Sequence, residues 1–240
     1  MSGDKIGLIF SHLHVRETEE YKFDILSYAI DHFKQIKNDI FIVVSGHGIA
    51  IPEFILDKIQ SVYWEDKIDN NEIGRGHPRF CIKGYDILKE NNIQNSIKLR
   101  GSDIIKNTDF LYSFFDSEAK IALTEQTCLE KGMIGDLLMV GKTDFMLEFW
   151  SVLPWDYSKS GLYNLYDNVI FLASRTNISV KEFLTEHACF VDPEEIGWYT
   201  FENNWNTNSK SPKEALTVEH LWGKIPGYSY HGGFDGINIA

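Results

Sequence analysis

The chain of 240 residues has few cysteines, a shortage of basic residues and no long apolar run. Its three cysteines, Cys81, Cys128 and Cys189, are odd in number and widely spaced, which fits neither a disulfide framework nor a cysteine-rich zinc site. This usage predicts a reducing, cytoplasmic environment. No uncharged stretch approaches the roughly 18 residues of a membrane span, and the first apolar run is short and flanked by charge, so we expect neither a signal peptide nor a transmembrane segment.

The shortage of positive charge argues against a nucleic-acid-binding protein. There are 35 acidic and 23 basic residues, giving a formal net charge of -12 that would repel a polyphosphate. Basic residues that bind an anion must therefore be concentrated locally. With 43% hydrophobic and 24% charged residues, the composition is that of a globular protein that can bury a large core.

The first part of the chain alternates between strand and helix patterns. Residues 6–15 are rich in β-formers, residues 19–37 place apolar side chains at helical spacing, and residues 39–48 form a nearly continuous apolar run that ends in glycine. A second helix at 78–91 and a strand at 97–99 continue the alternation. This order predicts an α/β fold with a mixed sheet flanked by helices.

The later part of the chain has a less regular pattern. We expect a helix over 143–152 with Thr143 as its N-cap, and another over 180–190 after a Ser179 cap. From about residue 202 the sequence is rich in Asn, Ser, Gly and aromatic residues. We therefore predict one domain over 1–201 and an extended tail over 202–240 that packs on it.

Polar residues stand at three predicted strand ends: SHLH (11–14), SGHG (45–48) and RGSD (100–103). In an open α/β sheet ligands bind outside the carboxyl ends of the strands, so we expect Ser11 and His47 to contact a ligand. The GxGxxG and GxxxxGK[ST] spacings are missing, which excludes a dinucleotide fingerprint and a P-loop. A bound nucleotide must be held in another way.

A local basic cluster precedes the second helix, with Arg75, His77 and Arg79 close together. Guanidinium groups beside a helix N-terminus suit a diphosphate, although charged loop residues are more often simply solvated. Asp103, just after a strand, could hold Mg²⁺ or Mn²⁺ whose other ligands are diphosphate oxygens and water. The competing interpretation of a single aspartate is a turn or a helix cap.

Residues 72–103, EIGRGHPRFCIKGYDILKENNIQNSIKLRGSD, resemble the WavE-type lipopolysaccharide-synthesis glycosyltransferases, in which a strand ends in a Lys-x-Arg-Thr-Asp-like motif. Residues 133–150 resemble the acidic segment of that family, and residues 184–190 its Pro-Glu-Gln helix. The resemblance spans roughly residues 39–190 in the correct order. It implies a GT-A-like glycosyltransferase that moves a hexose-like sugar from a UDP- or GDP-sugar to a glycan or polysaccharide acceptor, with Mn²⁺ or Mg²⁺.

The resemblance also implies roles for particular residues. Lys98 and Arg100 match the cationic positions of the strand-end motif, and Asp103 matches its metal-binding aspartate. Asp136 and Asp144 match the acidic positions of the later segment, and Glu186 matches the helix carboxylate. The chain departs from the family at Gly101-Ser102, which replaces one Thr, and at His187, which replaces Gln and is a candidate metal ligand.

The implied reaction displaces a nucleoside diphosphate from a sugar by an acceptor hydroxyl. An inverting enzyme needs a carboxylate to accept the hydroxyl proton, and Asp136 is the first candidate and Asp144 the second. Asp144 has a competing role because an acidic residue is favoured in the first turn of a helix. The aromatic residues of 149–166 could provide flat surfaces for sugar rings, but such residues are more often core.

A metal-dependent hydrolase is the alternative function. His12 and His14 follow an apolar strand, and the two-residue period of a strand would point both imidazoles the same way, as a two-histidine metal site requires. The pair resembles the opening of amidohydrolase-type enzymes, but no aspartate precedes it. A non-catalytic carbohydrate-binding module is a third interpretation, permitted by the aromatic content alone.

Overall fold

The computed structural model of the chain describes residues 5–66, 77–100, 103–105, 109–123, 132–136, 138–190 and 198–200. Its elements are β1 (Ile6–Val15), a 3-10 helix (Glu17–Glu19), α1 (Tyr21–Ile36), β2 (Phe41–Gly48), α2 (Glu53–Leu56), β3 (Ser61–Glu65), α3 (His77–Glu90), β4 (Asn95–Arg100), β5 (Asp103–Ile105), α4 (Asp109–Asp116), β6 (Ile121–Leu123), β7 (Met139–Lys142), α5 (Thr143–Ser151), α6 (Gly161–Thr176), α7 (Val180–His187), β8 (Ala188–Phe190) and β9 (Trp198–Thr200).

Within the described residues, seven strands form one sheet in the order β3-β2-β1-β4-β7-β6-β8. The strands β3, β2, β1 and β4 are mutually parallel, β7 is antiparallel to β4 and to β6, and β8 is parallel to β6. The carboxyl ends of β1–β4 therefore lie along one edge, which we call the carboxyl edge. The strand β5 follows β4 after two residues and pairs with β9 in a separate two-stranded sheet.

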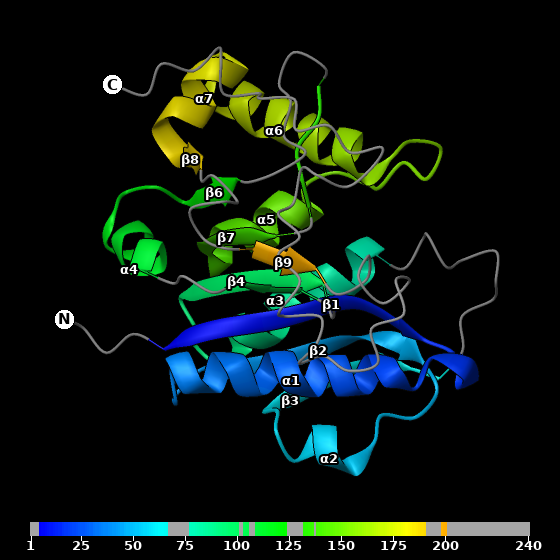
Figure 1. Cartoon of the computed structure of the whole chain (residues 1–240). Helices are drawn as coiled ribbons and strands as arrows, with labels where there is room; N and C mark the ends of the chain where they lie inside the picture. Colours follow the sequence, from blue (N-terminus) through cyan, green and yellow to red (C-terminus); the bar gives the residue numbers. More distant parts are fainter. Residues whose placement is uncertain are drawn as a thin grey trace.

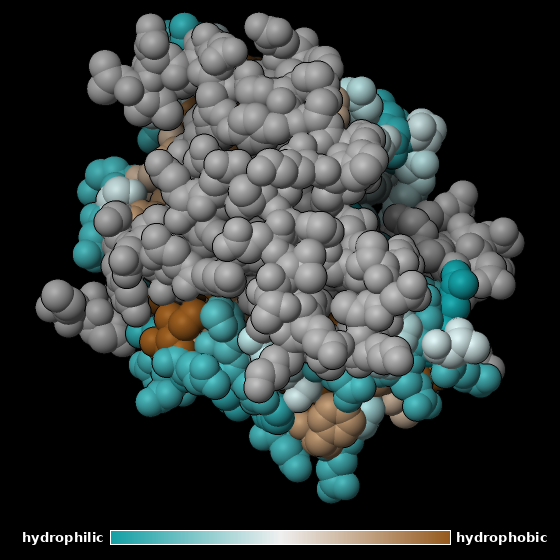
Figure 2. Space-filling view, viewed as in Figure 1, coloured by the Kyte–Doolittle hydropathy of each residue, from teal (hydrophilic) through white to brown (hydrophobic). Residues whose placement is uncertain are grey.

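Helices cover both faces of the seven-stranded sheet (Figure 1). The buried side chains of α1 and α4 pack with alternate residues of β1, such as Leu8 and Phe10. Ile9 points the other way and packs with α3, in a cluster that also contains buried residues of α5, α6 and α7. Where described residues are visible over α1 and α2, the surface is largely hydrophilic (Figure 2). The α/β fold with a mixed sheet flanked by helices is therefore confirmed.

The predicted elements of the first half agree closely with the structure. The strand 6–15 is β1, and the predicted helices at 19–37 and 78–91 are α1 and α3. Two later predictions need correction. Thr143 is the first residue of α5 rather than its N-cap, which is Lys142. The helix after Ser179 ends at His187, and the next three residues form β8; the Ser179 cap itself is confirmed, since its side chain accepts from Glu182 N.

A β-bulge interrupts β1 near its carboxyl end. The pairing of β1 with β2 shifts between Phe10 and Leu13, and His12 has a positive φ of 58°. Ile9 packs on the α3 face, whereas Leu13 and Val15 pack with Phe10 on the α1 face. The alternation of side chains is thus offset by one residue across the bulge, as expected when one extra residue is inserted. The bulge places His14 on the α3 face.

The predicted tail at 202–240 lies outside the described residues, so the domain boundary stays a prediction. No helix in the described ranges is both long enough and apolar enough to cross a membrane.

Candidate functional site

Five basic or imidazole side chains converge at the carboxyl edge: His12, His14, His47, Lys98 and Arg100. We call them the strand-end cluster. The cluster is assembled by three adjacent strands, because Ser11 of β1 is paired with Arg100 of β4 and His14 of β1 with His47 of β2. In a chain with a net charge of -12, this is a local concentration of groups that favour an anion.

A chain of hydrogen bonds fixes the tautomers of two of these histidines. Arg16 donates from Nε to His14 Nε2 at 3.0 Å, so a neutral His14 has its proton on Nδ1. His14 Nδ1 lies 3.2 Å from His47 Nδ1, which must accept that proton in a hydrogen bond. His47 therefore has its own proton on Nε2. Within the described part of the chain, this buried Nε2 has no hydrogen-bond partner.

The electrostatic environment keeps these imidazoles neutral at physiological pH. Burial, followed by the charges of Arg100 and Lys98, lowers the pKa of His12 to about 3. Burial, followed by the neighbouring His14, lowers the pKa of His47 to about 4, although Glu65 acts in the opposite direction. Burial and Arg16 also lower the pKa of His14. At neutral pH the cluster therefore has its positive charge on Lys98 and Arg100.

Lys98 is the best defined cation of the cluster, because its side chain has no exposed surface. Its Nζ donates a hydrogen bond to the main-chain oxygen of Asp136 and lies 5.4 Å from the centre of the Trp150 ring. Asp136 comes just before β7, whose first residue, Met139, is paired with Lys98. The antiparallel β7 thus brings a residue 38 positions away in the sequence to the carboxyl edge.

Asp136 lies beside the first turn of α6. A Cβ placed on Gly161 would lie 3.6 Å from Asp136 Oδ2 and 3.4 Å from Trp155 Cζ2. The carboxylate is therefore next to both the N-terminus of α6 and an aromatic side chain. Asp136 is 5% exposed, so a group that reaches it must be in a water-poor environment.

Two other predicted binding residues have different surroundings. Ser11 is fully buried, donates to the main-chain oxygen of Leu99 at 3.4 Å and lies 3.6 Å from Cys81 Sγ of α3. It packs inside the protein beneath α3. Arg79 of α3 is exposed and forms an ion pair with Glu65 at 2.6 Å. Glu65 is paired in the sheet with His47, so Arg79 lies at the border of the strand-end cluster.

The structure does not bring Asp144, His187 or Glu186 to the carboxyl edge. Asp144 follows β7 at the opposite end of β4, where it is exposed and paired with Lys89 at 2.9 Å. His187 packs edge-on against Phe183, and its main-chain oxygen accepts a hydrogen bond from Lys120 N. This contact also lies at the end of the sheet opposite to the carboxyl edge. Glu186 is an exposed residue of α7. Of the two candidate bases, only Asp136 is close to Lys98.

Three predicted residues cannot be placed in the site. Arg75 lies outside the described residues, and the side chains of His77 and Asp103 lie outside them although their positions begin α3 and β5. Among the residues that are described, no group of three or more His, Cys, Asp or Glu could hold a metal ion. The described side chains of the carboxyl edge, Lys98 and Arg100 with neutral imidazoles, fit an anion better than a cation.

Sequence reasoning missed the contacts of Trp150 and Arg16. Trp150 was considered only as one of several aromatic residues, yet it packs against Lys98 and stacks on Trp155 with ring centres 5.6 Å apart. Arg16 comes two residues after His14, the last residue of the SHLH segment, and this spacing along a strand is a signal that could have suggested their contact.

Comparisons with known proteins give a fold but no family. No family model matches the chain, and no curated protein matches it. A solved structure from Bacillus anthracis, described as a glucose-1-phosphate thymidylyltransferase in complex with a sucrose, aligns with a TM-score of 0.51 and 6% identity over 91% of this chain and 97% of that one.

Two further solved structures have TM-scores below 0.5. One is described as a nucleotide-diphospho-sugar transferase from Desulfovibrio desulfuricans, with a TM-score of 0.44 and 8% identity over 79% of this chain and 80% of that one. The other is a glycosyltransferase involved in the glycosylation of the major capsid of PBCV-1, with a TM-score of 0.46 and 8% identity over 88% of this chain and 97% of that one. At these identities only the fold is shared, and the WavE-type resemblance stays a prediction.

Proposed function

We propose that the chain is a glycosyltransferase that moves a sugar from a nucleotide-sugar donor to a glycan acceptor. The observation that supports this most strongly is the pair of cations, Lys98 and Arg100, at the carboxyl edge of an open α/β sheet. This edge is where α/β sheets bind nucleotides. The fold is shared with a protein described as a nucleotidyltransferase, which agrees with the proposal.

The donor diphosphate binds beside Lys98 and Arg100 in this proposal. Negative charge grows on the diphosphate as its bond to the anomeric carbon breaks, and the two cations stabilise that charge. The buried Lys98 does so effectively because water is excluded around it and its amine is already held by the Asp136 carbonyl. His47 Nε2 provides a neutral hydrogen-bond donor at the same edge.

Asp136 is the proposed general base. In an inverting transfer, the acceptor oxygen forms the new bond to the anomeric carbon, the diphosphate leaves with the electron pair of the broken bond, and the Asp136 carboxylate accepts the hydroxyl proton. Asp136 fits this role better than Asp144, because only Asp136 lies at the edge that contains the cations.

A divalent ion is a further element of the proposal. It would bind at Asp103 and would add charge stabilisation to the leaving diphosphate. His187 does not fit as its second ligand, because it lies at the opposite end of the sheet from β5. Polysaccharide assembly as the biological role, and a cytoplasmic location, follow from the WavE-type resemblance and the cysteine usage.

Thermal unfolding with a ligand panel tests the proposed function against its rivals. A ligand at 100 times its Kd stabilises a protein by about 2.7 kcal/mol, which is readily detected as a higher Tm. We expect UDP- or GDP-sugars to raise the Tm, with a further rise on adding Mn²⁺. Stabilisation by Zn²⁺ alone would instead support the hydrolase that uses His12 and His14, and stabilisation by free glycans alone would support a binding module.

A further inference from the structure

A pocket of about 310 Å³ lies between α3 and the chain segment that joins α5 to α6. We call it the aromatic pocket. Its lining includes two cations, Arg79 and Lys83, and three aromatic residues, Trp150, Trp155 and Tyr157. None of the strand-end cluster lines it, so it is distinct from the proposed diphosphate site. The two are neighbours through Trp150, which lines the pocket and contacts Lys98.

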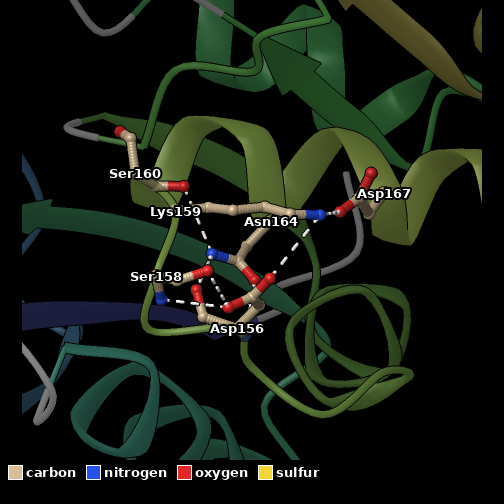
Figure 3. Close-up of polar contacts among 6 residues, drawn as sticks. All are labelled: Asp156, Ser158, Lys159, Ser160, Asn164 and Asp167. Carbon is tan, nitrogen blue, oxygen red and sulfur yellow. Dashed lines mark hydrogen bonds and ion pairs between the residues drawn. The ribbon is translucent and has the colours of Figure 1, made fainter.

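The aromatic wall of the pocket is held in place by α6. Asn164 accepts from Asp156 N at 2.8 Å and donates from Nδ2 to the main-chain oxygens of Asp156 and Ser160 at 2.9 and 3.2 Å. The Asp156 carboxylate in turn accepts from Ser158 N and Oγ (Figure 3). These bonds fix the loop that contains Trp155 and Tyr157, so the pocket is formed before a ligand arrives, which lowers the entropic cost of binding.

The charge of the pocket is opposite to that of the whole molecule. Arg79 and Lys83 contribute two cations, and the described residues that line the pocket include no carboxylate, although Arg79 is paired with Glu65 outside the lining. Lys83 is paired with Asp86 at 3.5 Å in an exposed contact, which is worth little and can be exchanged for a ligand at small cost. In a chain with a net charge of -12, this lining selects for an anionic ligand.

The shape of the pocket favours a sugar ring over a base. Trp150 and Trp155 stack on each other with an interplanar angle of 8°, which leaves no slot between them for a planar base. Tyr157 is 51% exposed and Trp155 is half-buried, so both present apolar surface beside the two cations. The volume is near the lower end of ligand pockets, roughly 300–1,000 Å³, and suits one ring rather than a complete nucleotide-sugar.

We infer that the aromatic pocket binds an acidic sugar, a pyranose ring that bears a carboxylate. The ring lies against Trp155 and Tyr157, and its carboxylate is held by Lys83 with support from Arg79. The position of Gly161 between Trp155 and the Asp136 carboxylate places the pocket beside the proposed base. The sugar is therefore a residue of the acceptor glycan next to the one that reacts; this assignment as acceptor rests on the proposed function, whereas the binding does not.

Direct binding of two simple sugars to the full chain tests this inference. Titrations followed by saturation-transfer NMR would compare methyl glucuronide with methyl glucoside, which differ only in the carboxylate. We expect the glucuronide to bind at least about fivefold more tightly, because charge-assisted hydrogen bonds exceed neutral ones. Lys83→Gln should abolish the preference. The matched control Lys159→Gln removes a cation of the adjacent loop that pairs with Asp167 outside the pocket, and it should keep the preference.

Variants of the aromatic wall separate this inference from the proposed function. Trp155→Ala should weaken the binding of both sugars by about tenfold, and Tyr157→Ala, a change at a more exposed position, should also weaken it. Neither variant should change the affinity for UDP or GDP. Equal affinity for the two sugars, a preference that survives Lys83→Gln, or loss of nucleotide binding in both aromatic variants would overturn the inference. A wild-type chain that binds the glucuronide but no nucleotide would refute the proposed transferase and leave the pocket intact.

Discussion

At the scale of single residues, the chain contains two buried or half-buried lysines that hold main-chain carbonyls at opposite ends of β4. Lys98 donates to the Asp136 carbonyl at the carboxyl edge, and Lys142 donates to the Phe115 carbonyl at the other end at 2.6 Å. Removing an amine from water is costly and each bond offsets part of that cost. Only Lys98 has cationic and imidazole neighbours, which is why we assign it a role in binding.

The first prediction concerns the proposed base. Asp136→Asn should lower kcat for transfer by about 10²–10⁴-fold, because a general base contributes that much, while nucleotide binding stays close to that of the wild type. Steady-state kinetics and a separate nucleotide titration measure the two effects. Asp144→Asn is the matched control at the opposite edge and should keep its kcat; an equal loss in both variants would remove Asp136 from the mechanism.

The second prediction concerns the pH dependence of the histidines. In the folded state the pKa of His47 is about 4 and that of His12 about 3, against about 6.5 in the unfolded chain. Between pH 6.5 and 3 the unfolded chain therefore binds more protons, so the free energy of unfolding should fall as the pH is lowered through this range. Denaturant unfolding at a series of pH values measures the trend.

Imidazole ¹H–¹⁵N spectra check the same histidines individually. His14 should appear as the Nδ1-H tautomer and His47 as the Nε2-H tautomer, and His47, whose pKa is lowered to about 4, should stay neutral at pH 6. Resonances of His47 that titrate near 6.5 would show that the imidazole is solvated, and the hydrogen-bond chain from Arg16 would then be wrong.

At the scale of elements, the sequence predicts the regular segments well and the irregular ones poorly. The apolar runs of β1 and β2 and the helical spacing of α1 are strong local signals, so these elements were found. The bulge at His12 was not, because a positive φ at a single histidine leaves no local pattern. The expected common orientation of His12 and His14 rests on an unbroken two-residue period, and the bulge interrupts that period.

Helix α6 was not predicted from the sequence, for a different reason. Its buried face contains Asn164, Leu165, Asn168, Val169 and Leu172, so two of the buried positions are polar asparagines. Asn164 and Asn168 are buried because their side chains hydrogen-bond main-chain groups of the preceding loop and of α5, which only the folded structure shows.

The third prediction tests the bulge. A Cβ added to Gly46 would overlap the main-chain oxygen of Leu13 in β1, so Gly46→Ala should lower the free energy of unfolding by about 1–3 kcal/mol. Chemical denaturation measures the change. Gly161→Ala is the control, because a Cβ there meets only ordinary contacts of 3.4 Å or more and should be neutral or stabilising by up to about 1 kcal/mol. A fully stable Gly46→Ala variant would contradict the close packing of β1 on β2.

At the scale of the whole molecule, the candidate site is a product of strand order. The order β3-β2-β1-β4-β7 places His47, His14, Lys98 and Asp136 side by side, although they come from four separate segments of the chain. Strand-end polarity predicted that the segments containing His47 and Arg100 meet at one edge, and Lys98 was assigned to the same site through the WavE-type resemblance. It could not show that Asp136 reaches the same edge and Asp144 the opposite one, because this depends on the antiparallel direction of β7.

The central claim is that the carboxyl edge binds a nucleoside diphosphate through Lys98 and Arg100, and calorimetric titration of UDP and GDP into three variants tests it most directly. We expect Lys98→Met and Arg100→Gln each to weaken binding at least about tenfold, equivalent to about 1.4 kcal/mol, whereas Lys142→Met, the matched lysine at the other end of β4, binds like the wild type. Equal affinity of all three variants and the wild type, or the absence of nucleotide binding by the wild type, would contradict the account.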